Sequence, residues 1–197
     1  MRNLFLVVCT AFALTIQAQD VSKALQVGDK APDFTLKNAQ GKRVRLYSLL
    51  EKGNVVMTWY RGGWCPYCNV ALGQLQEKLP EFKALNATLV ALTPELPDHS
   101  LSTQEKNKLE FEVLTDLNND VARQYGIVFK LDDQTAQRYE QALHLSSRNG
   151  TDSSELPVPA TYVLDKNGVI RYAFVHPDYK KRANPDEVLQ ALKEIRQ

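Results

Sequence analysis

Two cysteines, Cys65 and Cys68, are the residues of this chain best suited to chemistry. They stand in the run Trp64-Cys65-Pro66-Tyr67-Cys68, just before a segment in which apolar residues recur at helical spacing. A pair at this spacing on the first turn of a helix holds two sulfurs close enough to form a disulfide. The unpaired N–H groups and the dipole of the helix N-terminus stabilise a thiolate. The motif therefore predicts thiol–disulfide redox chemistry.

A zinc half-site and a purely structural disulfide are the two alternatives for this pair. Zinc takes four ligands, and His99, His144 and His176 show neither pairing nor metal-ligand spacing. A disulfide that closes so short a loop constrains the unfolded chain little, so it stabilises the fold little. Redox activity is therefore the favoured interpretation, and we expect no metal and no cofactor.

Arg61 and Trp64 lie just ahead of the pair, in a stretch with two glycines. A guanidinium four residues before Cys65, in a loop that can fold inward, would lower a thiolate pKa or bind a peroxide or a carboxylate. The alternative is a solvated loop arginine. Trp64 is expected to pack beside the sulfur and shape the site. The histidines are assigned no role, and the Lys-Lys-Arg run at 180–182 is interpreted as a solvated turn.

A strand and a helix must hold this motif in place. The run from Val55 to Tyr60 is β-branched and aromatic without alternation, which is typical of a central strand covered on both faces. Pro66 is tolerated in the first turn of the following helix. The inner face of that helix is expected to carry Val70, Leu72, Leu75, Leu79 and Phe82. A second buried strand at 88–93 completes a parallel β-α-β unit.

The remaining segments predict an α/β fold with a mixed central sheet and helices on both of its faces. An N-terminal hairpin is expected at 33–46, and a late antiparallel hairpin at 161–175. A closing helix is expected to begin after the cap Asn184, with Pro185 at its first position. Shorter elements are expected between them: strands at 111–114 and 128–131, helices at 100–109, 119–125 and 132–144, and a surface loop at 146–155.

The composition is that of an ordinary soluble globular protein. Of the 197 residues, 44% are apolar and 24% are charged, which excludes disorder, collagen and coiled coil. Lys plus Arg total 24 and Asp plus Glu total 23, so the whole molecule has no field that would steer a polyanion. We therefore expect no nucleic-acid partner and one compact domain.

The first residues predict export. One positive side chain precedes an uncharged apolar run from Leu4 to Ile16, which is too short to cross a bilayer as a helix. Residues 1–18 are therefore interpreted as a cleaved signal peptide, 19–26 as a linker and 27–197 as the domain, exported to a periplasm or out of the cell without stable membrane insertion. An uncleaved anchor and lipid attachment at Cys9 are the alternatives.

The strand running into the Cys-Pro-Tyr-Cys motif resembles the strand–loop–helix of the thioredoxin-fold superfamily, and the dipeptide Pro66-Tyr67 is the one that glutaredoxins carry. The stretch 158–161 resembles the cis-proline loop of that superfamily, which lies opposite the cysteines and receives the substrate backbone. The resemblance implies a cis bond between Val158 and Pro159. An ordinary trans proline at a strand entry is the alternative.

From about Val27 onward the chain resembles the peroxiredoxin branch (alkyl hydroperoxide reductase and thiol-specific antioxidant) of that superfamily. Residues 28–36 are similar to its entry motif, and residues 160–172 to its late hairpin. In that branch the peroxidatic cysteine follows a proline by seven residues and a threonine by three. This pattern puts Cys68 at the peroxidatic position, Cys65 at the threonine and Arg61 at the proline. The second arginine of the branch falls on Pro159.

The resemblance implies a thiol-dependent peroxidase that reduces hydrogen peroxide or organic hydroperoxides. Cys68 would attack, Cys65 would resolve, and a thioredoxin-like protein or a small thiol would reduce the disulfide. The alternative is an exported thioredoxin-like oxidoreductase of protein disulfides, in which Cys65 attacks, Cys68 resolves and Pro159 supports the substrate strand. The peroxidase is favoured because the resemblance spans nearly the whole mature chain. A binding module that had lost its chemistry would lack one cysteine, and both are present.

Overall fold

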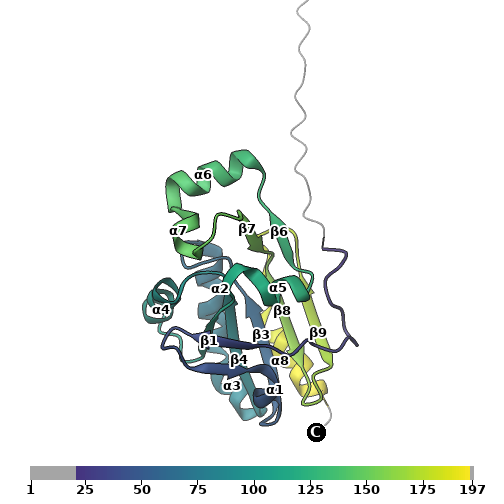
Figure 1. Ribbon diagram of the computed structural model, residues 1–197. Helices are drawn as coiled ribbons and strands as arrows, with labels where there is room; N and C mark the ends of the chain where they lie inside the picture. The colour runs from purple at the N-terminus through teal and green to yellow at the C-terminus, as the bar shows by residue number, and fades with distance from the viewer. Residues whose placement is uncertain (1–20, 196–197) are drawn as a thin grey trace, which may run out of the picture.

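Residues 21–195 are described by the structure, a computed structural model, and they build a mixed β-sheet with helices on both faces (Figure 1). The seven strands lie in the spatial order 2-1-5-4-3-8-9. Their bounds are β1 Thr35–Asn38, β2 Arg43–Arg45, β3 Asn54–Trp59, β4 Ala87–Thr93, β5 Glu112–Thr115, β8 Ala160–Leu164 and β9 Ile170–Val175. A second, two-stranded sheet pairs β6 Val128–Lys130 with β7 Glu155–Pro157.

The helices lie between the strands along the chain, singly or in pairs, and α8 follows the last strand. They are α1 Leu46–Leu50, α2 Pro66–Glu77, α3 Leu79–Ala84, α4 Pro97–Lys106, α5 Asp120–Gln124, α6 Asp133–Leu143, α7 Leu145–Asn149 and α8 Pro185–Glu194, with a 3-10 turn at Leu117–Asn119. In Figure 1, α6 and α7 stand at one end of the molecule beside β6 and β7. No helix among residues 21–195 is both long and apolar enough to cross a membrane.

The pairing of β3 determines where the site forms. β3 runs parallel to β4 and antiparallel to β8, and its last residue, Trp59, lies opposite Leu92 and Ala160. The chain that leaves β3 therefore emerges beside the carboxyl end of β4 and the start of β8. Open α/β sheets bind their ligands at such carboxyl ends.

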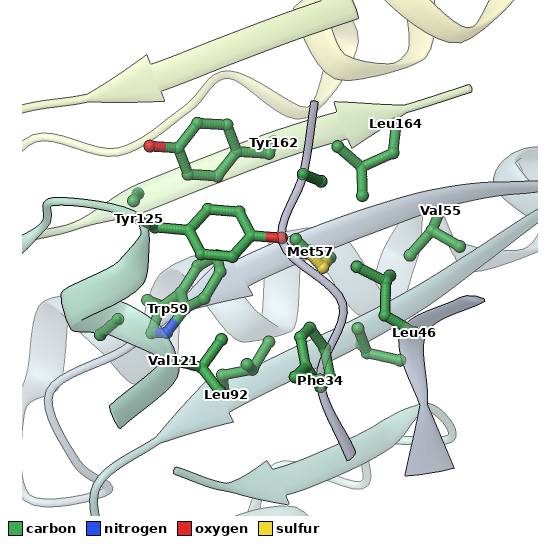
Figure 2. Packing of buried hydrophobic residues seen from close by; sticks show 14 of the residues in the cluster. Phe34, Leu46, Val55, Met57, Trp59, Leu92, Val121, Tyr125, Tyr162 and Leu164 are labelled. Atoms are coloured by element: carbon green, nitrogen blue, oxygen red, sulfur yellow. The ribbon is translucent and has the colours of Figure 1, made fainter. Parts of the chain in front are cut away.

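The side chains of β3 alternate between two separate apolar clusters, as a strand with both faces covered requires. Val55, Met57 and Trp59 enter one cluster, under α1 and α5. Figure 2 shows this cluster, in which the Trp59 ring centroid lies 4.9 Å from that of Tyr125 and 5.9 Å from that of Tyr162. The other cluster, under α2, α3 and α8, contains both cysteines.

Most of the architecture expected from the sequence is confirmed. The N-terminal hairpin is β1 and β2, with Leu36 opposite Val44, and the late hairpin is β8 and β9. β3, the strand that leads into the cysteine motif, pairs in parallel with β4 as expected. Asn184 caps α8, because its side-chain oxygen accepts the Asp186 N–H at 3.0 Å.

Two local expectations are wrong. Part of the surface loop expected at 146–155 is helical, because Leu145 is buried against Leu131 and Leu156 and so anchors α7 beneath α6. Val70, expected on the inner face of its helix, has 61% of its surface exposed. The helix carrying Val70 ends at Glu77 and a second one starts at Leu79, so the inner face is not one continuous stripe.

Residues 21–26 lie against the turn that follows α5. Ala24 is buried, and the Leu25 N–H donates to the Tyr125 oxygen at 3.1 Å. Gly126 permits this approach, because a Cβ there would lie 2.1 Å from the Lys23 oxygen. Residues 1–20, with the predicted signal peptide and Cys9, and residues 196–197 lie outside the described residues.

Candidate active site

Cys65 and Cys68 lie at the N-terminus of α2, as the motif predicts. Cys65 is the N-cap residue, Pro66 takes the first helical position, and the N–H groups of Cys68 and Asn69 each donate to the Cys65 oxygen at 3.1 Å. Both sulfurs are free thiols. Only 2% of the surface of Cys65 and none of that of Cys68 is exposed, so the pair lies under other residues rather than at an open surface.

The two thiols differ in acidity. The pKa of Cys65 is lowered to about 6, first by a hydrogen bond from the Cys68 thiol, then by the Cys68 N–H and by the charges of Arg61 and Arg182, against the opposing effect of burial. Burial and the neighbouring thiolate raise the pKa of Cys68 well above its ordinary value. The arrangement therefore supplies a thiolate at Cys65 and a protonated thiol beside it, which is what nucleophilic attack followed by disulfide formation requires.

Arg61 is folded inward, which is the first of the two arrangements considered for it. Only 2% of its surface is exposed, and its Nη2 donates to the Tyr139 hydroxyl at 2.9 Å. Its guanidinium lies 5.1 Å from the ring centroid of Trp64, 5.4 Å from that of Tyr139 and 4.8 Å from that of Tyr179. Three aromatic rings thus hold a buried cation whose charge lowers the pKa of Cys65.

The glycines of the loop are required by close contacts. A Cβ on Gly62 would lie 2.2 Å from Trp64 Nε1, and one on Gly63 would lie 1.9 Å from Thr103 Oγ1. The Gly63 N–H also donates to the carboxylate of Glu95 at 2.8 Å. The loop therefore packs directly on the α4 segment, and its backbone cannot be moved without disturbing Cys65.

Glu95 is a fully buried carboxylate that the sequence interpretation did not select. It lies just after β4, and beyond the Gly63 bond it pairs with Arg148 at 3.4 Å. Burial raises the pKa of this carboxyl, and the Gly63 N–H and Arg148 oppose that rise. Its place after a parallel strand is a signal that could have identified it. Tyr139, on the polar helix α6, has no such signal.

Arg182 is the second residue that the sequence interpretation missed. Its Nη2 lies 3.2 Å from Cys68 Sγ and 4.0 Å from Cys65 Sγ. The solvated turn expected at 180–182 holds for Lys180 and Lys181, which are exposed, and is wrong for Arg182. A run of three adjacent cations has no periodicity that would tell which side chain points inward. The contact of Arg182 with the sulfurs depends instead on the path of the chain between β9 and α8.

The cis bond expected between Val158 and Pro159 is absent: among the described residues every peptide bond is trans. The neighbouring bonds keep this segment extended. The Val158 N–H donates to the Ile127 oxygen at 2.8 Å, and the Pro159 oxygen accepts the His176 N–H at 3.1 Å. The segment passes from β7 into β8 as an extended chain, so the trans alternative is the one observed.

The other residues of the motif form the outer rim of the site. Pro66 and Tyr67 are exposed, and the Tyr67 ring centroid lies 5.8 Å from that of Tyr179. Trp64 is half-buried and packs on Tyr139, at 5.3 Å between centroids. Within residues 21–195 no three His, Cys, Asp or Glu side chains come together as a metal site.

Comparison with known proteins indicates the family. The sequence pattern of the AhpC/TSA family matches residues 27–173. The chain is 27% identical to the chloroplastic peroxiredoxin Q of Sedum lineare over 169 residues, which cover 86% of this chain and 78% of that protein. It is 22% identical to the thiol-disulfide oxidoreductase ResA of Bacillus thuringiensis subsp. konkukian over 170 residues, which cover 85% of this chain and 81% of that protein.

Solved structures agree with this assignment at the level of the fold. The peroxidoxin BcpB of Mycobacterium tuberculosis is similar with a TM-score of 0.69 at 22% identity, covering 88% of this chain and 99% of that one. A cysteine-to-serine mutant of the peroxiredoxin 6 of Arenicola marina is similar with a TM-score of 0.71 at 16% identity, covering 87% of this chain and 74% of that one. These likenesses confirm the expected thioredoxin-like fold of the peroxiredoxin branch. With its buried dithiol at the head of α2, the chain belongs to the AhpC/TSA family, a family of thiol-based oxidoreductases.

Proposed function

We propose that this protein is a thiol-dependent peroxidase that reduces hydrogen peroxide or organic hydroperoxides through Cys65 and Cys68. The observation that carries the proposal is the acidic, buried Cys65 beside a protonated Cys68 and two guanidinium groups. A small hydroperoxide needs little room to reach a sulfur with 2% of its surface exposed, whereas a folded protein substrate needs much more. The peroxiredoxin relatives support the same reaction class.

In the proposed reaction, the Cys65 thiolate attacks one oxygen of the hydroperoxide. The O–O bond breaks, the alcohol leaves with a proton from solvent, and Cys65 becomes a sulfenic acid. The Cys68 thiol then attacks the Cys65 sulfur, so that an S–S bond forms and water leaves. The positive charges of Arg61 and Arg182 favour the thiolate and the developing charge on the leaving oxygen. Two electrons from an external thiol donor, a thioredoxin-like protein or a small thiol, restore the pair.

This order exchanges the roles that the family motif implies for the two cysteines. Alignment to that motif makes Cys68 the attacking residue, but burial raises its pKa, whereas the pKa of Cys65 is lowered to about 6. Among related thiols, the one that is ionised at ambient pH attacks faster. We therefore assign the attack to Cys65 and the resolving step to Cys68.

Stopped-flow mixing of the reduced protein with hydrogen peroxide tests the proposal. We expect the wild type and Cys68→Ser to consume peroxide much faster than free cysteine does, with Cys68→Ser trapping a sulfenic acid at Cys65 that mass spectrometry detects. Cys65→Ser should not react. A wild-type rate no faster than that of free cysteine would exclude the peroxidase, and a sulfenic acid at Cys68 in Cys65→Ser would restore the order implied by the motif.

A second candidate is a thioredoxin-like oxidoreductase of protein disulfides. The position of the acidic Cys65 at the N-cap, with Cys68 behind it, favours this candidate, and so does the similarity to ResA. Reduction of insulin disulfides by the reduced protein, with no measurable peroxide consumption, would identify it. Both candidates use the same pair, and for both we propose export directed by residues 1–18. N-terminal sequencing of secreted protein tests the export, since a sequence that begins at Met1 would contradict cleavage.

A further inference from the structure

The chain between β9 and α8 covers the dithiol. Arg182 reaches both sulfurs with one nitrogen, and the Tyr179 ring lies over the Arg61 guanidinium and against the Tyr67 ring. We call residues 177–183 the lid segment. It begins two positions after the last residue of β9 and ends just before the cap of α8.

The lid segment is attached to the rest of the molecule by few bonds. Within residues 21–195, its hydrogen bonds end inside the segment or on the adjoining His176, with one exception. That exception is the contact of Arg182 Nη2 with the two sulfurs. The other nitrogen, Nη1, donates to the oxygens of Tyr179 and Lys181, so the guanidinium ties its own segment to the cysteines.

The covered pair presents a problem for turnover. An external thiol must approach a disulfide sulfur directly in order to attack it. In the reduced protein 2% of the surface of Cys65 and none of that of Cys68 is exposed. Residues of the lid segment therefore have to move before a reductant can reach the oxidised pair.

The charge of the pair changes during the reaction. Reduced, it includes the Cys65 thiolate, whose negative charge attracts the Arg182 guanidinium, with Nη2 4.0 Å from that sulfur and 3.2 Å from the protonated Cys68 sulfur. Oxidation to the disulfide removes two electrons and, because Cys65 is already ionised, one proton from the pair, and the resulting sulfurs are neutral and weak acceptors. With a hydroperoxide as oxidant, the two electrons, the Cys68 proton and one proton from solvent end in an alcohol and a water. The attraction between Arg182 and the pair is therefore strong in one redox state only.

We propose that Arg182 is a catalytic residue of this site that holds the lid segment closed over the reduced dithiol and releases it when the disulfide forms. The closed state keeps the thiolate away from bulky reactants, and the open state admits the reductant. The proposal rests on the dithiol chemistry proposed above. In the family motif, an arginine stands at the position that Pro159 takes in this chain. Arg182 supplies a cation near the sulfurs from another part of the chain.

Trypsin cleavage after Lys180, followed by mass spectrometry, measures the state of the lid segment in the full chain. The disulfide form is made with diamide, which takes up the two electrons, the Cys68 proton and one proton from solvent, and the reduced form is freed of reductant under anaerobic conditions. We expect wild-type cleavage to be roughly tenfold faster in the disulfide form, the scale of one lost charge-assisted hydrogen bond. Arg182→Gln should be cleaved at that faster rate in both forms.

Two further variants complete the test. Lys181→Gln removes an exposed cation from the same segment without a sulfur contact and should keep the wild-type difference. Cys65→Ser removes the thiolate and should open the segment without any oxidant. Equal cleavage of both wild-type forms, or protection that persists in reduced Arg182→Gln, would overturn the lid proposal. Failure of diamide to form a Cys65–Cys68 disulfide would instead overturn the proposed function.

Discussion

The residue that distinguishes this site is a cysteine whose ordinary chemistry is changed by its neighbours. Cys65 accepts hydrogen bonds from the thiol and the N–H of Cys68 and faces two arginines, which lower its pKa to about 6. At pH 7 such a thiol is about 90% ionised, whereas a free cysteine is about 3% ionised. Neither Arg61 nor Arg182 forms an ion pair with a carboxylate within residues 21–195, so their charges act on the sulfurs.

The acidity of Cys65 predicts a pH profile. The rate of alkylation of Cys65 by iodoacetamide, measured by mass spectrometry, should rise with pH through a midpoint near the Cys65 pKa of about 6 and level off above it, because only the thiolate reacts. Arg61→Gln should move that midpoint upward by about one pH unit, since a nearby cation favours the charged form. Arg138→Gln, an exposed arginine on α6, is the matched control and should leave the midpoint unchanged. A midpoint near that of free cysteine in the wild type would contradict the assignment.

At the scale of elements, four segments form the site: the N-terminus of one helix, one tight loop, a second helix and the chain that precedes the last helix. α2 supplies the cysteines, the loop after β3 supplies Arg61, and α6 supplies Tyr139. The chain before α8 supplies Arg182. The loop has the least freedom of these, because Gly63 contacts α4 and Glu95 at the same time.

Two glycine variants should change the free energy of unfolding in opposite directions, one in the loop and one in α2. Gly63→Ala places a Cβ 1.9 Å from Thr103 Oγ1, so we expect a loss of about 1–3 kcal/mol in the free energy of unfolding and a fall in Cys65 reactivity. Gly73→Ala, inside α2 with no atom within 4 Å of the added Cβ, should raise the free energy of unfolding by about 0.5–1 kcal/mol. Urea unfolding and the alkylation rate measure both. An unchanged alkylation rate in Gly63→Ala would show that the loop does not position Cys65.

The elements differ in how far the sequence predicts them. The strand at Val55, the Cys-x-x-Cys helix and the hairpins follow from local periodicity and turn chemistry, which act within a few residues. α7 does not, because Leu145 gains its anchor only from residues distant in the chain. Arg182 and Tyr139 belong to the same class: their contacts with the site arise when separate segments meet, and no spacing in the sequence records that meeting.

On the scale of the whole molecule, the sheet separates structural support from chemistry. The cluster of Figure 2, with Leu46, Tyr125 and Tyr162, lies on the face away from the cysteines, and the cluster on the other face includes Cys65 and Cys68. Both clusters are continuous across β3, β4 and β8, because alternate side chains of these strands enter each one. Unfolding should therefore involve both faces together, while the reactivity of the thiols should depend on one of them.

Leucines buried on the two faces test this separation. Leu46→Ala and Leu72→Ala each empty a site in which at most 2% of the leucine is exposed, and each should lower the free energy of unfolding by about 2–5 kcal/mol. Leu72 lies one turn after Cys68 on α2, so its loss should also slow the reaction of Cys65 with iodoacetamide and raise the pH midpoint of that reaction. Leu46→Ala should leave the midpoint at the wild-type value under conditions where it remains folded, as near-ultraviolet circular dichroism verifies. A midpoint shifted equally in both variants would mean that the two faces of the sheet do not act separately on the thiols.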